Sequence, residues 1–213
     1  MKTRERIIHA ALELFNEHGE ANVTTNHIAA HLKISPGNLY YHFRNKEQII
    51  DSIFDAYAQD LQLSFTPQAQ YGSEELLTYL DAIFMLMWRY RFFYANLPDI
   101  LRRDEQLQEK YLIAQEMVHQ NAVTLLESFR ENGLLSLGDK EMQGLANTLK
   151  LVISSWVAYQ TAQAPKARIT KSVVYLGVLQ ILSIVKPLTT GLGKQRVMEL
   201  ESHYSDQAQQ DLL

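Results

Sequence analysis

Residues 23–46, VTTNHIAAHLKISPGNLYYHFRNK, contain two helix starts separated by a very short turn. Thr24 can cap the first helix, because a hydroxyl oxygen accepts hydrogen bonds from the N–H groups of the first helical turn. Ser35 can cap the second helix, and Pro36 fits the first helical position, where no N–H is needed. Only Lys33–Ile34 remain between the two helices. A helix, a short turn and a second helix are typical of proteins that place the second helix in a DNA major groove.

The same stretch resembles the DNA-binding segment of the tetracycline-repressor (TetR) family. The shared features are a threonine pair, Ile-Ala, a small turn, the pattern S-x-G-x-LY-x-HF and a lysine that opens the next helix. They fall on Thr24, Thr25, Ile28, Ala29, Ser35, Gly37, Leu39, Tyr40, His42, Phe43 and Lys46. The resemblance covers residues 4–55 at the level of motifs. It implies an all-α fold, in which an N-terminal three-helix helix-turn-helix domain is joined by a connector helix to a larger helical domain for ligand binding and dimerisation.

The turn departs from the family pattern at one position. Members of the family usually have glycine there, because the chain tends to need a positive φ, whereas this sequence has Lys33. A left-handed conformation of a residue other than glycine costs on the order of 1 kcal/mol, which a packed three-helix unit can absorb. We therefore keep the helix-turn-helix prediction and expect this lysine to lie in solvent.

The second predicted helix offers side chains that can read bases. Leu39 and Phe43 lie four residues apart and form its buried side, so the neighbouring rings face outward. Asn38 can pair with an adenine edge, Gly37 permits a close approach of the backbone, and Pro36 offers an apolar contact to a thymine methyl. Surface residues of proteins that do not bind DNA show similar patterns, so each assignment is a hypothesis.

Helix starts also favour phosphate, because their N–H groups and the positive end of the helix dipole point outward. The threonine pair and Ser35 are therefore expected to contact the DNA backbone, and Lys46 adds a charge beside the same strand. The resemblance implies that Tyr40 and His42 touch DNA, His42 at a phosphate. The complete predicted DNA-binding set is Thr24, Thr25, Asn26, Ser35, Pro36, Gly37, Asn38, Tyr40, Tyr41, His42 and Lys46.

The charge of the chain is distributed unevenly. The 213 residues carry a net charge of −4, yet residues 1–50 contain six basic and five acidic side chains. We therefore expect modest non-specific affinity for DNA and a strong dependence on base contacts and on a dimer. The chain has no cysteine, its first residues are too charged for a signal peptide, and the apolar run 173–185 is too short to span a bilayer. These features predict a cytoplasmic protein with no membrane partner.

Apolar residues at helical spacing recur along the whole chain. The predicted helix-turn-helix domain covers residues 1–48, with a connector helix at about 46–64 that starts after Asn45. Pro67 and Gly72 mark a boundary at 66–72, and residues 66–213 form the predicted regulatory and dimerisation domain. Within that domain we expect helices at about 73–96, 104–132, 139–163, 169–186 and 195–204, with a break at Pro98 and a left-handed cap at Gly133.

The helix predicted at 169–186 is apolar on nearly every side, and such a helix has to be buried all round. The outermost helices of a small protein can be buried in this way when a second subunit covers them. We therefore expect a homodimer in which the helices at about 139–163 and 169–186 of each chain form a four-helix interface, as the TetR resemblance also implies. The alternative is that both helices fill the core of a monomer.

Large side chains in the second domain suggest a site for a small-molecule effector. Met85, Trp88, Phe92, Tyr111 and Trp156 are the candidates for lining an apolar pocket between helices. Residues of these types also form ordinary protein cores, and that alternative stays open. If a ligand binds, it must prefer a conformation in which the two recognition helices no longer match two half-sites.

Other chemistry has little support in the sequence. His27 and His31 have a spacing that can hold a metal ion, but no third ligand is evident, so no metal site is predicted. Nucleotide-binding glycine motifs are absent, and no serine has a recognisable base partner, so we expect neither an enzyme nor a cofactor. The sequence predicts a DNA-binding transcriptional regulator, a dimeric repressor of a palindromic operator released by a hydrophobic or amphipathic ligand. The alternative is a helix-turn-helix protein that acts through a protein partner.

Overall fold

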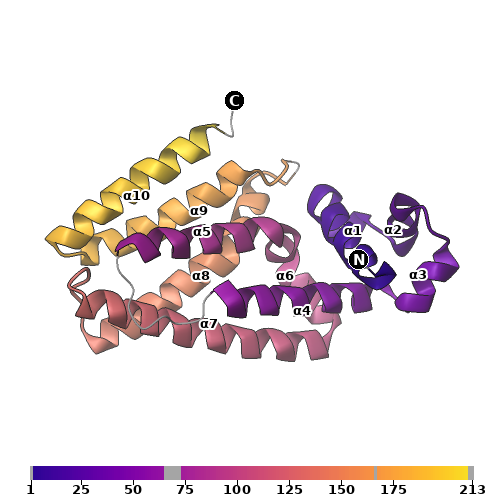
Figure 1. Cartoon of the computed structure of the whole chain (residues 1–213), viewed down its shortest axis with the longest axis horizontal. Helices are drawn as coiled ribbons and strands as arrows, with labels where there is room; N and C mark the ends of the chain where they lie inside the picture. The colour runs from indigo at the N-terminus through magenta and orange to yellow at the C-terminus, as the bar shows by residue number, and fades with distance from the viewer. Residues whose placement is uncertain (1, 65–72, 166, 211–213) are drawn as a thin grey trace.

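The computed structural model describes residues 2–64, 73–165 and 167–210, and these residues fold into two helical parts (Figure 1). The smaller part lies at one end of the molecule and contains the helix-turn-helix. Its elements are α1 (Thr3–His18), a 3-10 turn η1 (Glu20–Asn22), α2 (Thr25–Leu32) and α3 (Pro36–His42). Helix α4 (Lys46–Ser64) leaves this part and runs along the larger one, as the connector prediction requires.

The core of the small domain follows from the helical spacing of its apolar residues. Ile7 and Phe15 of α1, Ile28 of α2 and Leu39 of α3 are all buried, and Ile53 of α4 joins the same cluster. Each helix therefore places one apolar face inward and leaves its polar face in solvent. Helix α4 therefore packs on the DNA-binding unit through this shared core.

The larger domain is a bundle of longer helices (Figure 1). They are α5 (Ser73–Arg89), α6 (Arg91–Arg103), α7 (Glu105–Glu131), α8 (Asp139–Gln163), α9 (Lys171–Val185), the 3-10 turn η2 (Lys186–Leu188) and α10 (Gly191–Gln210). Gly133 has a φ of 68° and ends α7, as predicted. The final helix is much longer than the predicted 195–204, and it buries Tyr204. The boundary predicted at 66–72 lies in a segment outside the described residues.

The region around Pro98 differs from the sequence prediction. The helix expected at 73–96 divides at Tyr90, and Pro98 lies inside α6 instead of ending a helix. The distortion falls two residues earlier, at Asn96, whose φ and ψ are −126° and 15°. The Asn96 amide donates to the Phe92 carbonyl at 2.9 Å, which gives that carbonyl a partner where the helix is irregular. A kink rather than a break therefore accommodates the proline.

Helix α9 packs against α5, α8 and α10. Close packing on α8 depends on Gly177, since a Cβ atom there would lie 2.6 Å from Trp156 Cδ1. Helix α9 and η2 together form an 18-residue stretch, Lys171–Leu188, that is long and apolar enough to cross a membrane by length and composition alone. This stretch is longer than the predicted run 173–185, and only 33% of it is buried within one chain.

Candidate nucleic-acid interface

The first helix of the motif is capped as its sequence predicts. Thr24 Oγ1 accepts a hydrogen bond from the His27 N–H at 3.3 Å, and His27 Nδ1 accepts one from the Thr24 N–H at 3.3 Å. The turn that follows contains Lys33 with φ 56° and ψ 41°, a left-handed conformation held by a residue other than glycine. The lysine side chain is exposed, as expected. The turn geometry of the family pattern is therefore present without its usual glycine.

Helix α3 separates buried from exposed residues sharply. Ser35 Oγ accepts a hydrogen bond from the Asn38 N–H at 3.1 Å and so starts the helix. Leu39 and Phe43 are 0% and 2% exposed, so the predicted buried side is confirmed. The predicted DNA-contact residues Pro36, Gly37, Asn38, Tyr40 and Tyr41 all lie on the exposed side, and Tyr41 is 85% exposed. This side presents amide, hydroxyl and apolar groups at one protruding edge of the domain.

Tyr40 is held in place by the first motif helix. Its hydroxyl lies 3.0 Å from Thr25 Oγ1, and the hydrogen bond ties α3 to the start of α2. His42 is half-buried, with its ring edge-on to that of Tyr41 at 5.1 Å between centroids. Asn26 is exposed near the start of α2. Because the two hydroxyls are already held in place, the pair can donate a hydrogen bond to a phosphate oxygen without a change in the position of either helix.

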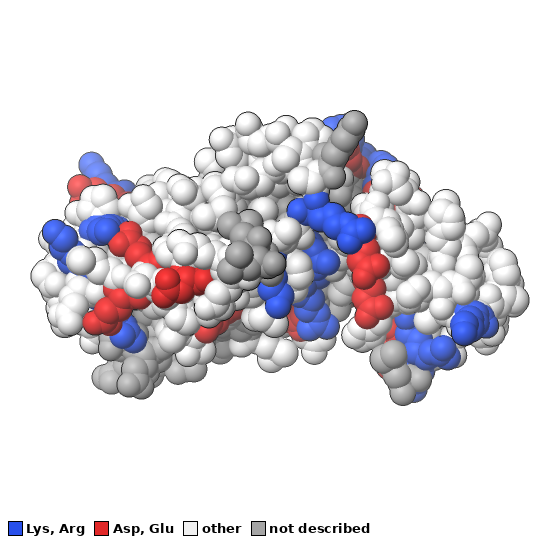
Figure 2. Space-filling view, turned by 90° about the horizontal axis from the view of Figure 1, so that it is seen from above, with Lys and Arg blue, Asp and Glu red and all other residues white. Residues whose placement is uncertain are grey.

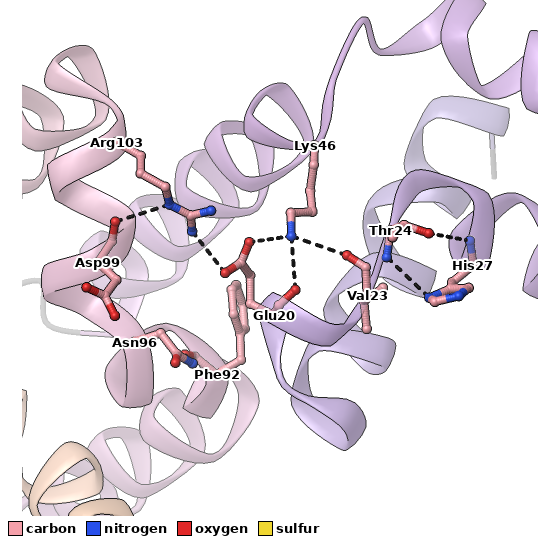
Figure 3. Close-up of polar contacts among 9 residues, drawn as sticks. All are labelled: Glu20, Val23, Thr24, His27, Lys46, Phe92, Asn96, Asp99 and Arg103. Carbon is pink, nitrogen blue, oxygen red and sulfur yellow. Dashed lines mark hydrogen bonds and ion pairs between the residues drawn. The ribbon is translucent and has the colours of Figure 1, made fainter.

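Lys46, predicted to contact phosphate, has three partners within the protein. Its Nζ donates to the backbone carbonyls of Glu20 at 3.0 Å and Val23 at 3.2 Å, and forms an ion pair with Glu20 Oε1 at 2.7 Å (Figure 3). An ammonium group has three protons, and protein oxygens lie within reach of all three. Lys46 therefore fastens the chain before α2 to the start of α4, and its charge is compensated inside the protein.

The carboxylate of Glu20 also connects the two domains. It is 4% exposed, and Arg103 at the end of α6 donates to its Oε2 at 2.9 Å (Figure 3). Burial raises the pKa of Glu20, but hydrogen bonds and charge from Lys46 and Arg103 outweigh this, so the pKa lies below its ordinary value. Glu20 is thus an ionised residue shared by η1, α4 and α6, and nothing in its local sequence distinguishes it from a surface glutamate.

Further contacts join α1 to the larger domain. Asn16 donates to the Arg89 carbonyl at 2.8 Å and accepts from the Phe92 N–H at 3.0 Å, so it satisfies backbone groups where α5 passes into α6. Figure 2 shows Lys and Arg side chains gathered on the larger domain beside a strip of Asp and Glu side chains where the domains meet. The DNA-binding unit is therefore attached through α1 as well as through α4.

One basic residue next to the recognition helix was not singled out in the sequence. Arg44 lies two residues after the end of α3 and is exposed, and among the described residues its guanidinium has no hydrogen-bond or ion-pair partner. A free cation beside the exposed side of α3 is suited to bind a phosphate. Its position immediately before the cap at Asn45 was the only available signal.

The larger domain contains an apolar cavity of about 120 Å³, measured as space for the centre of a water molecule. Its wall includes Tyr57 and Leu61 of α4, and the other walls come from α5 to α10. None of the five predicted pocket residues lines it. Met85 is exposed, Phe92 packs on Phe15 of α1, Trp88 lies under the Arg91 guanidinium at 4.0 Å, Tyr111 neighbours Phe93, and Trp156 donates to the Val173 carbonyl.

Known proteins resemble the chain along most of its length. Residues 7–53 match the family profile described as bacterial regulatory proteins, tetR family, and residues 56–197 match that of a TetR bacterial transcriptional repressor. The crystal structure of a TetR-family transcriptional regulator from Marinobacter aquaeolei is 34% identical, with a TM-score of 0.86 over 96% of this chain and 99% of the other.

Other named regulators match over shorter stretches. The regulator SrpR of Pseudomonas putida is 36% identical over 66 residues, and the class C tetracycline repressor of Escherichia coli is 40% identical over 53 residues. These matches cover 31% and 25% of this chain, and only 31% and 24% of the two relatives. The exposed helix-turn-helix, the helical second domain and the two family profiles together show that this chain belongs to the TetR family of DNA-binding transcriptional regulators.

Proposed function

We propose that the protein is a dimeric repressor that binds a palindromic operator in the cytoplasm and is released by a small hydrophobic or amphipathic ligand. The observation that carries the proposal is the exposed side of α3, where Asn38 and Tyr41 project from a helix anchored by fully buried Leu39. Asn38 can distinguish adenine in the major groove, and its neighbours can contact sugar and phosphate. No step of this function requires catalysis.

The surface of α8 supports the dimer. Its outward stripe runs through Gly144, Thr148, Leu151, Ser155 and Tyr159, all exposed and none charged. Leu151 is 63% and Tyr159 is 56% exposed, which is unusual for an uncharged stripe unless another surface covers it. Leu176 on the adjacent α9 is 41% exposed. A second copy packed on α8 and α9 would bury these residues and pair two recognition helices for half-sites about 34–36 Å apart.

The cavity supports release by a small ligand rather than by a protein partner. Helix α4 begins three residues after the buried Phe43 and contributes Tyr57 to the cavity wall. Lys110 of α7 also holds Asp51 and Asp55 of α4 at 2.6 and 2.9 Å. A ligand that favours another position of α4 would therefore shift the two recognition helices relative to one another.

The proposal is tested by selecting bound sequences from random DNA at a stated salt concentration and weighing the complex. We expect a palindromic consensus bound by two chains. Asn38→Ala should lower affinity for the consensus by about 1–3 kcal/mol while leaving random DNA nearly unaffected. Gln195→Ala, an exposed polar side chain on α10, is the matched control. Binding without any enriched sequence would contradict an operator-specific repressor.

A further inference from the structure

Two buried tyrosines in the cavity wall carry an unused hydrogen-bond donor. Tyr57 of α4 and Tyr94 of α6 both line the cavity and are 3% and 5% exposed. Their hydroxyl oxygens lie 3.2 Å apart, and either can donate to the other. Two hydroxyls have two protons, but only one proton can lie in the bond between them. One O–H group of the pair therefore remains available.

No other protein group in the described part of the chain takes up this donor. The neighbouring Tyr90 hydroxyl donates to Asp60 at 2.7 Å, so that carboxylate is engaged elsewhere. Most of the cavity wall is apolar, with side chains such as Leu61, Leu80 and Ile83, and its polar side chains, among them Gln115 and Asn121, form no hydrogen bond with either tyrosine in the described part of the chain. A buried donor without an acceptor is costly, and a bound molecule that supplies an acceptor removes that cost.

The surroundings of the pair favour a neutral acceptor over an anion. Burial raises the pKa of Tyr57 to about 12 and that of Tyr94 well above its ordinary value, so both hydroxyls stay protonated near neutral pH. The ring of Tyr57 lies edge-on to that of Tyr90 at 5.3 Å between centroids, and the Asp60 carboxylate bonded to Tyr90 is already paired with Arg89 at 2.9 Å. An anion placed beside the two buried tyrosines would lose its hydration, which costs far more for a charged acceptor than for a neutral one.

From this donor count we infer that the cavity takes an uncharged, mainly apolar molecule with one acceptor oxygen, such as a ketone, ester or amide carbonyl, bound by the Tyr57–Tyr94 pair. The inference rests on the proposed function, because it assigns the chemical class of the effector. It also gives the effector a direct contact with α4, since Tyr57 belongs to the connector helix. The apolar remainder of the molecule would fill the space between α5 and α10.

The test compares two probes of nearly equal shape, acetophenone and cumene, in which a carbonyl oxygen replaces a methyl group. Their affinities for the full-length protein are measured by titration calorimetry, and the ratio of the two is the readout. We expect the double variant Tyr57→Phe/Tyr94→Phe to lower the preference for acetophenone about five- to tenfold. Each single variant should keep most of the preference, because one hydroxyl still offers one free proton.

The control variant is Tyr204→Phe, which removes a buried hydroxyl bonded to Asp81 outside the cavity wall and should leave the ratio unchanged. An unchanged ratio in the double variant, or tighter binding of benzoate than of acetophenone, would overturn the inference. If the inference is overturned but both acetophenone and cumene release operator DNA, the proposed function survives and the cavity is simply apolar. If none of the probes binds, the inference and the effector part of the proposed function both fall.

Discussion

The turn residue Lys33 stores a small amount of conformational free energy. Its φ of 56° costs a residue with a Cβ atom roughly 1–2 kcal/mol, whereas glycine loses about 0.5–1 kcal/mol more backbone freedom on folding. Lys33→Gly should therefore raise the free energy of unfolding by about 0.5 kcal/mol in urea titrations. Lys33→Ala keeps the Cβ atom and should give no such gain. Equal effects of both variants would show that the side chain, not φ, matters.

Gly37 separates stability from DNA binding. An added Cβ atom would meet no protein atom closer than Ser35 Oγ at 4.0 Å, so the folded protein has room for alanine. Gly37→Ala should leave stability unchanged or raise it by up to about 0.5 kcal/mol, because alanine favours the helix. Operator affinity, measured in a filter-binding assay, should fall by about tenfold if the backbone approaches DNA closely. Undiminished affinity would contradict that approach.

Arg44 and Lys46 are two cations near the recognition helix with opposite expected roles. Arg44→Ala should reduce the slope of log affinity against log salt by about 0.9, because one phosphate contact is lost. Lys46→Ala should leave that slope nearly unchanged and lower the free energy of unfolding by about 1–3 kcal/mol, because Glu20 loses a partner. If Lys46→Ala also lowers the slope of log affinity against log salt, the result would support the predicted contact between Lys46 and phosphate.

At the scale of elements, the sequence predicted what local patterns determine. The caps at Thr24 and Ser35, the stop at Gly133 and the bounds of α8 follow from residues close to each other in the chain. The kink at Asn96 did not follow, because proline limits the backbone without specifying where a helix yields. The cavity did not follow either, since it is space left between seven helices and not a property of large side chains.

The contact between η1 and α6 should make stability depend on acid. The pKa of Glu20 in the folded chain lies below its ordinary value of 4.5, so its contribution is complete above that value and is lost as the pH falls through the folded pKa. Arg103→Gln removes one partner, raises the pKa of Glu20 and should shift this loss to higher pH. Urea unfolding between about pH 7 and pH 3 measures the shift.

Arg102→Gln is the matched control for that experiment, because Arg102 pairs on the surface with Asp99 and does not reach Glu20. Its acid profile should follow that of the unmodified protein. Identical profiles for Arg103→Gln and Arg102→Gln would mean that the contact between η1 and α6 contributes nothing to the ionisation of Glu20.

For the whole molecule, the uncharged stripe on α8 should decide the assembly. Leu151→Arg places two like charges across the proposed interface, and we expect light scattering to give a mass near the 24.5 kDa of one chain instead of twice that value. Operator affinity should fall at least about a hundredfold, because two half-sites are no longer bound together. Leu112→Arg alters an equally exposed leucine on α7 and should remain dimeric.

The positions of the two tryptophans have a practical consequence. Trp88 lies under Arg91 where α5 passes into α6, close to the attachment of the DNA-binding unit, whereas Trp156 lies between α8 and α9 beside the proposed contact with a second chain. The protein has no other tryptophan. Its ultraviolet emission is therefore the sum of two spatially separate signals. Trp88→Phe would leave Trp156 as the sole reporter for the subunit contact, and Trp156→Phe would leave Trp88 as the sole reporter for the junction between α5 and α6.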